Sequence, residues 1–363
     1  MRFSGLHHTK NSLLITSSLI SLLLIVLYFW YPGFNNKYQD HDSREAARIM
    51  AASIDIISEY CRDHQVNIDM INDPAFTGLV GTEMSGITTT IGHLEAKRTT
   101  IDPLFASLVV ELLAEAGVKS GDTIAIGSSG SFPALLIASL AAAEAMQLHP
   151  RVIISLGSSS YGANNPEFTI LDIYQLLLEN GIFSTGPSAI SLGGEYDRGV
   201  GFDEDALELM ESKIKKSGYP FIFEPDLKSN VRRRDEIYSM AGKVHIKAFI
   251  NTGGSYANMG TDPLSLKLQP GLVGEVKIPG EESQGLIFLM LSRQIPVIHL
   301  LYIKGIVQRY NMEWDPVSSS AGDESVAIST RSSNRAIIPA VCSIVLFALF
   351  LLRFSKLNNI KSS

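Results

Sequence analysis

Cysteine is scarce in this sequence, with two residues among 363. Cys342 lies in an apolar run near the carboxyl end, which leaves Cys61 as the one cysteine in the more polar middle of the chain. A disulfide within that middle part is therefore excluded, and cysteine usage does not indicate a redox compartment.

Several familiar motifs are also missing. The sequence has no glycine-rich phosphate loop ending in Lys-Ser or Lys-Thr, no Gly-x-Gly-x-x-Gly fingerprint, no Cys/His metal spacing and no His-Glu-x-x-His. These absences leave an ATP-driven ligase or a nucleotide-linked dehydrogenase of familiar type unsupported. We expect neither a metal nor a cofactor.

An excess of positive charge is absent as well, because the formal net charge is -7 at pH 7. Five basic residues and no acid stand near the two ends, and subtracting them leaves a net charge of -12 for the part between. Such a surface repels nucleic acid and other polyanions on average, so nucleic acid is not an expected partner. An anionic ligand would need a local basic patch.

The chain does have two long apolar runs, one near each end. Leu13–Tyr31 contains no charged residue, and at about 1.5 Å per residue it is long enough for a hydrocarbon core of about 30 Å. The second run lies between Arg335 and Arg353. The alternatives are a cleaved signal peptide for the first run and a buried core helix for the second. Bulky aromatics at the end of the first run and the arginine brackets of the second favour two membrane spans.

We therefore predict a two-pass protein of the cytoplasmic (inner) membrane, with the lipid bilayer as a partner. Both tails are expected to be cytoplasmic and the main domain extracytoplasmic, because the short tails carry basic residues and no acids. The predicted segments are a short basic tail (1–12), a transmembrane helix (13–31), an extracytoplasmic α/β domain (32–315), a Ser-rich tether (316–334), a second transmembrane helix (335–353) and a short basic tail (354–363).

Between the two runs, short apolar segments alternate with amphipathic helical patterns. This alternation predicts an α/β fold with a mostly parallel sheet and helices on both faces, flanked by the N- and C-terminal transmembrane helices. Expected strands are 123–127, 151–157, 188–193, 220–223, 244–251 and 296–302. Expected helices are 44–65, 103–116, 132–146, 168–179, 203–216 and 226–242.

Ligands of open parallel sheets collect at the carboxyl ends of the strands, so the loops after the expected strands are candidate sites. The loop Gly127–Pro133 resembles the Gly-x-Ser-x-Gly nucleophile elbow, with Ser129 as nucleophile and Ser131 in place of the last glycine. The amides at the start of the following helix would suit an anion or an oxyanion. Turn chemistry alone also explains such a loop and is its commoner origin. Its ligand-binding candidates are Ser128, Gly130 and Ser131.

A second polar cluster, residues 81–100, precedes the helix expected from residue 103. Lys97 is a candidate base for a serine if it is desolvated, Glu95 is a further catalytic candidate, and Arg98 is a candidate clamp for a carboxylate. A β-branched strand followed by a solvated charged turn explains the cluster equally well. Its ligand-binding candidates are Glu83, Thr88, Thr89, Thr90 and Arg98.

Further loops rich in glycine and serine follow other expected strands, which makes one shared ligand-binding rim a reasonable expectation. Asp197 and Arg198 also fit exposed turn residues, and the run Arg232–Arg234 fits a solvated helix face better than an anion patch. His299, in an expected strand, fits a satisfied core histidine. The candidates from these loops are Ser159, Asn164, Asp197, Arg198 and Ser255.

Several of these motifs together resemble the bacterial poly-gamma-glutamate system protein family. The strings are Gly81–Thr90 (GTEMSGITTT), Leu94–Thr99 (LEAKRT), Gly127–Ala134 (GSSGSFPA), Gly157–Thr169 (GSSSYGANNPEFT) and Gly193–Gly199 (GGEYDRG). The resemblance covers roughly residues 46–310. It implies a membrane-anchored role in the biosynthesis, export or anchoring of poly-γ-glutamate at the cell envelope, with that polymer or its synthase subunits as partners. It supplies no reaction and no catalytic residue.

Two functional hypotheses remain. The first is a membrane accessory protein of the poly-γ-glutamate (capsule) system with an anion-binding rim, which requires Lys97, Arg98 and Arg198 to converge. The second is a serine-type hydrolase or transferase acting on γ-glutamyl amide bonds, with Ser129 as nucleophile and Lys97 as base. The second hypothesis requires Lys97 to lie within hydrogen-bond reach of the loop after Gly127.

Overall fold

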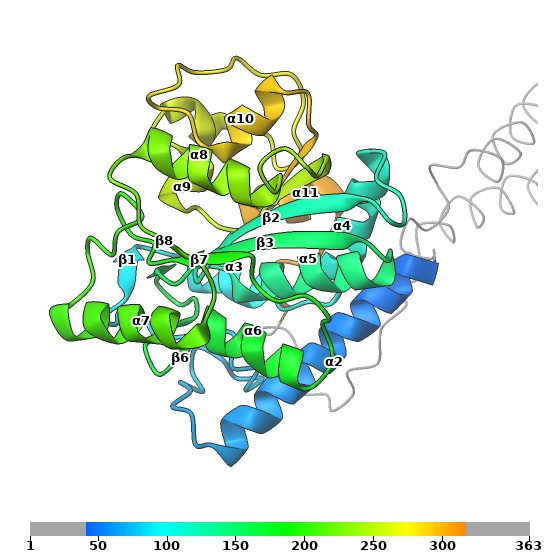
Figure 1. The fold of residues 1–363 in the computed structure, drawn as a ribbon. Helices are drawn as coiled ribbons and strands as arrows, with labels where there is room; N and C mark the ends of the chain where they lie inside the picture. Colours follow the sequence, from blue (N-terminus) through cyan, green and yellow to red (C-terminus); the bar gives the residue numbers. More distant parts are fainter. Residues whose placement is uncertain (1–40, 317–363) are drawn as a thin grey trace, which may run out of the picture. The chain divides into compact units, whose positions relative to one another are not determined.

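The computed structural model describes residues 41–316 (Figure 1). The two predicted tails and the two predicted transmembrane helices lie outside these residues, as does all of the predicted tether after Pro316. Within 41–316, no helix combines the length and the apolarity that a bilayer crossing needs.

A seven-stranded sheet forms the centre of the fold, with the strand order β10-β11-β9-β2-β3-β7-β8. Neighbouring strands are parallel throughout, apart from the antiparallel pair of β10 and β11. The expected α/β class with a mostly parallel sheet is therefore confirmed. The strands are β2 (Thr123–Ser129), β3 (His149–Ser155), β7 (Ala189–Ser191), β8 (Phe221–Ile222), β9 (Ile246–Asn251), β10 (Gly271–Leu272) and β11 (Val297–His299).

All six strands expected from the sequence are present, and β10 is the addition. The prediction missed β10 because it has two residues and its neighbours show no alternation. The central strand β2 is buried on both faces after its first residue, as an apolar run in a covered parallel sheet requires. β7 is shorter than expected because the chain turns at Gly193 and Gly194, whose positive φ angles of 82° and 73° end the extended backbone.

Helices cover both faces of the sheet (Figure 1). On one face α5 is buried over most of its length, because it lies between the sheet and the long amphipathic helix α2. The opposite face is covered by α8 and α10. The helices are α2 (His41–Asp63), α3 (Leu94–Thr99), α4 (Leu104–Glu115), α5 (Pro133–Ala145), α6 (Ile170–Glu179), α7 (Glu204–Ser217), α8 (Leu227–Tyr238), α9 (Tyr256–Met259), α10 (Leu286–Ser292) and α11 (Ile303–Tyr310), with a 3-10 helix at Pro263–Lys267.

The order of the strands places the switch point of the sheet between β2 and β9. The chain runs outward from β2 through β3, β7 and β8, and then returns to the other side of β2 with β9. Ligands of such sheets bind at the carboxyl ends of the strands beside this point. The loops that follow β2 and β9 therefore occupy the position where the sequence led us to look for a site.

Two short strand pairs extend this edge. β1 (Thr88–Thr90) is parallel to β4 (Ser158–Ser159), and β5 (Asn164–Asn165) is antiparallel to β6 (Phe168–Thr169). Because β4 follows β3 directly, its pairing with β1 brings the polar segment 81–100 to the carboxyl end of the central sheet.

Candidate functional site

A lysine and a serine from distant parts of the chain meet at this edge. Lys97 Nζ lies 2.7 Å from Ser159 Oγ, and it also donates to the carbonyl oxygen of Ser131. The ammonium end lies 3.5 Å from the centre of the Phe132 ring. Lys97 is 2% exposed and Ser159 is 7% exposed, so bulk water is largely excluded from the pair. We call Lys97 and Ser159 the dyad.

The β1–β4 pairing positions the dyad. Thr90 is in register with Ser159, and the chain leaves β1 through Gly92 to enter α3, which carries Lys97. A Cβ atom at Gly92 would lie 3.1 Å from Ser159 Oγ and 3.3 Å from Lys97 Cε. The absence of a side chain at residue 92 is therefore what allows the lysine to reach the serine.

Burial changes the acid–base behaviour of the lysine. Desolvation lowers the pKa of Lys97 from 10.5 to about 7. Within residues 41–316, the hydrogen-bonding groups that face Nζ are the Ser159 hydroxyl and the Ser131 carbonyl, and no carboxylate forms an ion pair with it. An amine with this pKa is partly neutral near neutral pH, which is the state that a general base needs.

The nucleophile expected from the sequence, Ser129, is not the hydroxyl that meets Lys97. Ser129 Oγ accepts a hydrogen bond from the Ser131 amide at 3.4 Å, and Ser131 Oγ accepts one from the Ser159 amide at 3.0 Å. The expected approach of Lys97 to the loop after Gly127 is confirmed by its contact with Ser131, but the paired hydroxyl is Ser159. The elbow motif favoured Ser129 as the nucleophile. The contact of Lys97 with Ser159 depends instead on the two-residue strand β4, which contains Ser159 and pairs with β1.

Arg98 does not face the dyad. Its guanidinium forms two hydrogen bonds to Asp315, with Nε at 2.7 Å and one terminal nitrogen at 2.5 Å from the carboxylate oxygens. Arg98 is therefore committed to a protein carboxylate, and its expected role as a clamp for a ligand carboxylate is replaced by a contact with the end of the described chain.

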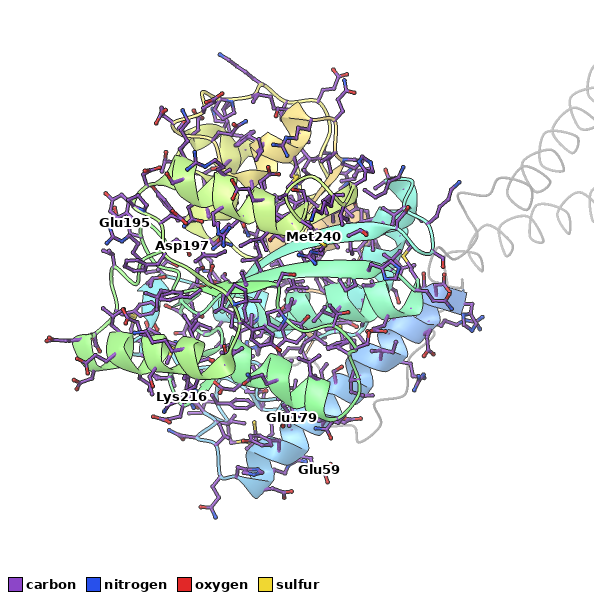
Figure 2. All side chains as sticks on the ribbon, in the orientation of Figure 1. Glu59, Glu179, Glu195, Asp197, Lys216 and Met240 are labelled. Atoms are coloured by element: carbon purple, nitrogen blue, oxygen red, sulfur yellow. The ribbon has the colours of Figure 1, made fainter. Side chains whose placement is uncertain are left out.

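Asp197 and Arg234 form a second buried polar cluster, at the carboxyl ends of β3 and β7. Their side chains lie 2.6 Å apart and both are 0% exposed. Ser155, Ser191 and Asn230 complete the cluster. Asp197 is buried while Glu195 of the same turn is exposed (Figure 2). The expectation of an exposed turn is therefore wrong for Asp197. The expectation of a solvated Arg232–Arg234 run is wrong for Arg234, whereas Arg232 and Arg233 are exposed.

Arg198, the neighbour of Asp197, is exposed, and its guanidinium lies 4.7 Å from the centre of the Phe223 ring. The three cations that the anion-binding hypothesis requires therefore have separate partners. Lys97 contacts Ser159, Arg98 contacts Asp315, and Arg198 stacks on Phe223.

The acidic candidates Glu83 and Glu95 are exposed and lie near Tyr161. Desolvation, and then the charge of the nearby Glu83 and Glu95, raise the pKa of Tyr161, which follows Ser159 by two residues. Glu95 makes no hydrogen bond to Lys97, so nothing places it in the dyad.

The remaining candidates hold the loops together. Thr88 Oγ1 accepts from the Asn164 side chain, Thr89 donates to the carbonyl of Ser158, and Ser255 caps α9 by accepting from the Asn258 amide. Thr90 is exposed, Ser128 Oγ is buried without a hydrogen-bond partner among residues 41–316, and a Cβ at Gly130 would lie 2.7 Å from the Leu156 carbonyl. These contacts describe a rigid scaffold around the dyad.

Sequence reasoning missed the side chains on the β9 side of the switch point. Asn251 Oδ1 accepts from Asn258, and Asn251 Nδ2 lies 3.1 Å from His299 Nδ1. Desolvation lowers the pKa of His299 to about 4, so this histidine is neutral at physiological pH. The expectation that His299 is a satisfied core residue is confirmed.

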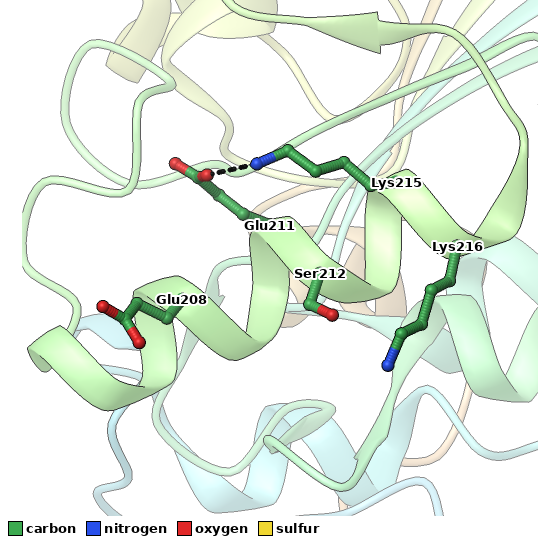
Figure 3. A pocket seen from close by; sticks show the side chains of 5 residues that line it. All are labelled: Glu208, Glu211, Ser212, Lys215 and Lys216. Atoms are coloured by element: carbon green, nitrogen blue, oxygen red, sulfur yellow. Dashed lines mark hydrogen bonds and ion pairs between the residues drawn. The ribbon is translucent and has the colours of Figure 1, made fainter.

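A shallow depression on the outer side of α7 is lined by Glu208, Glu211, Ser212, Lys215 and Lys216 (Figure 3). All five residues come from one helix, and Glu211 and Lys215 form an ion pair one turn apart. No residue of the dyad lines this depression. Within residues 41–316, no cluster of His, Cys, Asp and Glu fits a metal ion.

Comparison of the chain with protein-family models, with curated proteins and with solved structures gave no significant match. The argument for function therefore rests on the dyad and its surroundings.

Proposed function

We propose that this protein is a serine hydrolase or acyl transferase in which Ser159 is the nucleophile and Lys97 is the general base. The observation that carries the proposal is the distance of 2.7 Å between a buried serine hydroxyl and a buried lysine amine whose pKa is lowered to about 7. A serine hydroxyl is a weak nucleophile, and an adjacent neutral amine is one of the known ways to activate it.

The contacts of Lys97 suit proton transfer. A neutral amine has two N–H bonds and one lone pair. One N–H bond donates to the Ser131 carbonyl, which orients the amine so that the lone pair is free to accept the proton of Ser159 Oγ. The dyad thus needs no histidine and no metal ion to activate the serine.

The reaction proceeds in two steps. As Lys97 takes the proton, Ser159 Oγ forms a bond to the substrate carbonyl carbon. The tetrahedral intermediate then collapses as the carbon–nitrogen bond breaks, and Lys97 returns its proton to the leaving amine. In the second step Lys97 takes a proton from the attacking water, or from a second amine in a transfer reaction, as the new bond to the acyl carbon forms. Lys97 then returns that proton to Ser159 Oγ as the ester bond breaks, which regenerates the dyad.

We further propose that the substrate is a γ-glutamyl amide bond of poly-γ-glutamate, at the membrane. The support for this substrate is the resemblance of the sequence motifs to the poly-gamma-glutamate system family together with an amide-cleaving constellation. A purely polymer-binding accessory role has weaker support, because Lys97 and Arg98 face Ser159 and Asp315.

A fluorophosphonate probe tests the nucleophile. We expect the full-length protein in detergent to be labelled once, on the peptide that contains Ser159. Ser159→Ala removes the labelling, and Ser129→Ala, the matched control from the neighbouring loop, keeps it. Lys97→Met slows the labelling by roughly 10²–10⁴-fold, which is the usual contribution of a general base. Equal labelling of wild type and Ser159→Ala would remove the proposal.

The substrate is tested in cells that secrete the polymer. We expect Ser159→Ala to change the chain length of poly-γ-glutamate relative to wild type while Ser129→Ala does not. If the probe labels Ser159 of the wild-type protein but the Ser159→Ala strain secretes polymer of wild-type length, the hydrolase chemistry stands and the polymer is not its substrate.

A further inference from the structure

The end of the described chain returns to the helix that carries the dyad lysine. After α11 the segment reaches α3, where Asp315 binds two consecutive residues. Its carboxylate accepts two hydrogen bonds from Arg98, and its backbone amide donates to Thr99 Oγ1 at 2.9 Å. Both of these residues directly follow Lys97.

The helix α3 depends on such contacts because it is short. It has six residues, and its N-cap residue His93 makes no side-chain cap hydrogen bond. A helix of this length is unstable by itself in water, so tertiary contacts decide its position. Ala96 is buried in the core, and Asp315 holds Arg98 and the fully buried Thr99.

Position matters at Lys97 because the space is tight. The lysine reaches Ser159 past Gly92, where even one added carbon would lie 3.3 Å from Lys97 Cε. A small rotation of α3 about its axis would move the amine away from Ser159 Oγ and toward water.

We propose that Arg98 and Asp315 are positioning residues for the dyad, so that the seating of the carboxyl-terminal segment on α3 sets the alignment of Lys97 with Ser159. The inference rests on the proposed function of the dyad. Asp315 immediately precedes the segment predicted to lead to the second membrane span. Arg98 is the next residue after Lys97, so a displacement of that segment is transmitted through Asp315 and Arg98 to the lysine.

The charged groups around α3 are consistent with this assignment. The hydrogen bonds that Arg98 donates to Asp315 outweigh desolvation and, together with the charges of Asp315 and Glu95, raise the pKa of Arg98, so the guanidinium stays charged. Lys97 faces Ser159, the Ser131 carbonyl and the Phe132 ring, and its lowered pKa arises from desolvation. Loss of the Asp315 contact lets water reach Lys97 and moves its pKa back toward that of a solvated lysine.

The test uses the full-length protein in detergent with ¹³Cε-labelled lysine, and the signal of Lys97 is assigned by its absence in Lys97→Met. We expect Asp315→Asn to raise the titration midpoint of the Lys97 signal by about one pH unit. At pH 7 the rate of fluorophosphonate labelling at Ser159 falls about fivefold, because the neutral fraction of Lys97 falls from about one half to about one tenth. Arg98→Lys, which keeps the charge but loses the two-pronged contact, shifts the midpoint in the same direction by a smaller amount.

The control is Glu45→Gln on α2, which breaks an ion pair of the same two-pronged type between exposed Arg48 and Glu45. We expect it to leave the midpoint and the labelling rate unchanged. A folded Asp315→Asn or Arg98→Lys protein with a wild-type midpoint overturns the positioning role. If Ser159 is never labelled but the midpoint still shifts, the positioning of Lys97 stands and the proposed hydrolase fails.

Discussion

Lys97 and Arg234 are both buried cations at the carboxyl edge of the sheet, and they differ in what faces them. Arg234 forms an ion pair with Asp197, and three polar side chains complete its surroundings. Lys97 faces a hydroxyl, a carbonyl and an aromatic ring. One cluster matches charge with charge, whereas the other leaves an amine without a carboxylate partner.

The difference separates a structural role from a chemical one. Arg234 and Asp197 compensate each other's charge, and breaking the pair leaves an uncompensated buried charge, although Arg234 Nη1 is buried without a hydrogen-bond partner among residues 41–316. A desolvated lysine without a counter-charge is instead driven toward its neutral form, which accepts a proton from a neighbouring hydroxyl. Burial of a cation by itself therefore does not indicate a reactive site.

The largest expected effect is on the free energy of unfolding when Arg234 or Lys97 is replaced by methionine. Arg234→Met leaves Asp197 charged and buried, and we expect the free energy of unfolding to fall by about 3–5 kcal/mol in a urea titration. Lys97→Met replaces an unpaired amine by an apolar side chain and changes the same free energy by less than about 1.5 kcal/mol. Equal losses in the two variants would break the comparison.

The second expected effect is a pH dependence of the free energy of unfolding to which Lys97 contributes and Arg234 does not. The pKa of Lys97 is lowered in the folded protein to about 7 from 10.5, so between these values the unfolded chain binds one proton more than the folded chain. The free energy of unfolding contributed by this group therefore rises with pH across that window, by at most about 1.4 kcal/mol per pH unit.

The measurement is the difference in unfolding free energy between wild type and Lys97→Met, taken near pH 7 and near pH 9 in urea. We expect wild type to gain on the variant as the pH rises. A difference that stays constant, or that falls, would show that Lys97 remains charged in the folded protein and would remove the contrast with Arg234.

The smallest expected effect concerns the approach of the lysine. In Gly92→Ala the new methyl group would lie 2.5 Å from the Ser160 carbonyl, so the backbone must shift, at a cost of about 1–3 kcal/mol. Labelling of Ser159 falls by roughly tenfold to a hundredfold, because the dyad is displaced. The control is Gly274→Ala, where no atom lies within 4 Å of the added carbon. Similar losses in both variants would contradict a special role for Gly92.

Some features of the site were predictable from the sequence. The alternation of apolar and amphipathic segments predicted the parallel sheet and the edge on which the site lies. Lys97 was a candidate base because it lies in a dense polar cluster, which a β-branched strand followed by a solvated charged turn explained equally well. The burial of Arg234 also left a signal, since it shares one face of α8 with Val231 and Tyr238 at helical spacing.

Other features were beyond reach because they depend on pairings between distant segments. Ser159 and Lys97 are 62 residues apart, and Arg98 and Asp315 are 217 residues apart. The elbow-like motif favoured Ser129, because a local sequence pattern predicts the turn that carries a serine. It does not predict which distant lysine contacts that serine.

The sequence by itself determined six of the seven strands of the central sheet and the six longest helices of residues 41–316, since apolar periodicity and turn residues act over a few neighbouring positions. It did not determine short elements such as β4 and α3. It also determined which residue types are available at the edge of the sheet. The tertiary structure alone decided which serine contacts Lys97 and which carboxylate pairs with Arg98. Those choices follow from strand register and from the exclusion of water around particular side chains, and both arise only when distant parts of the chain pack together.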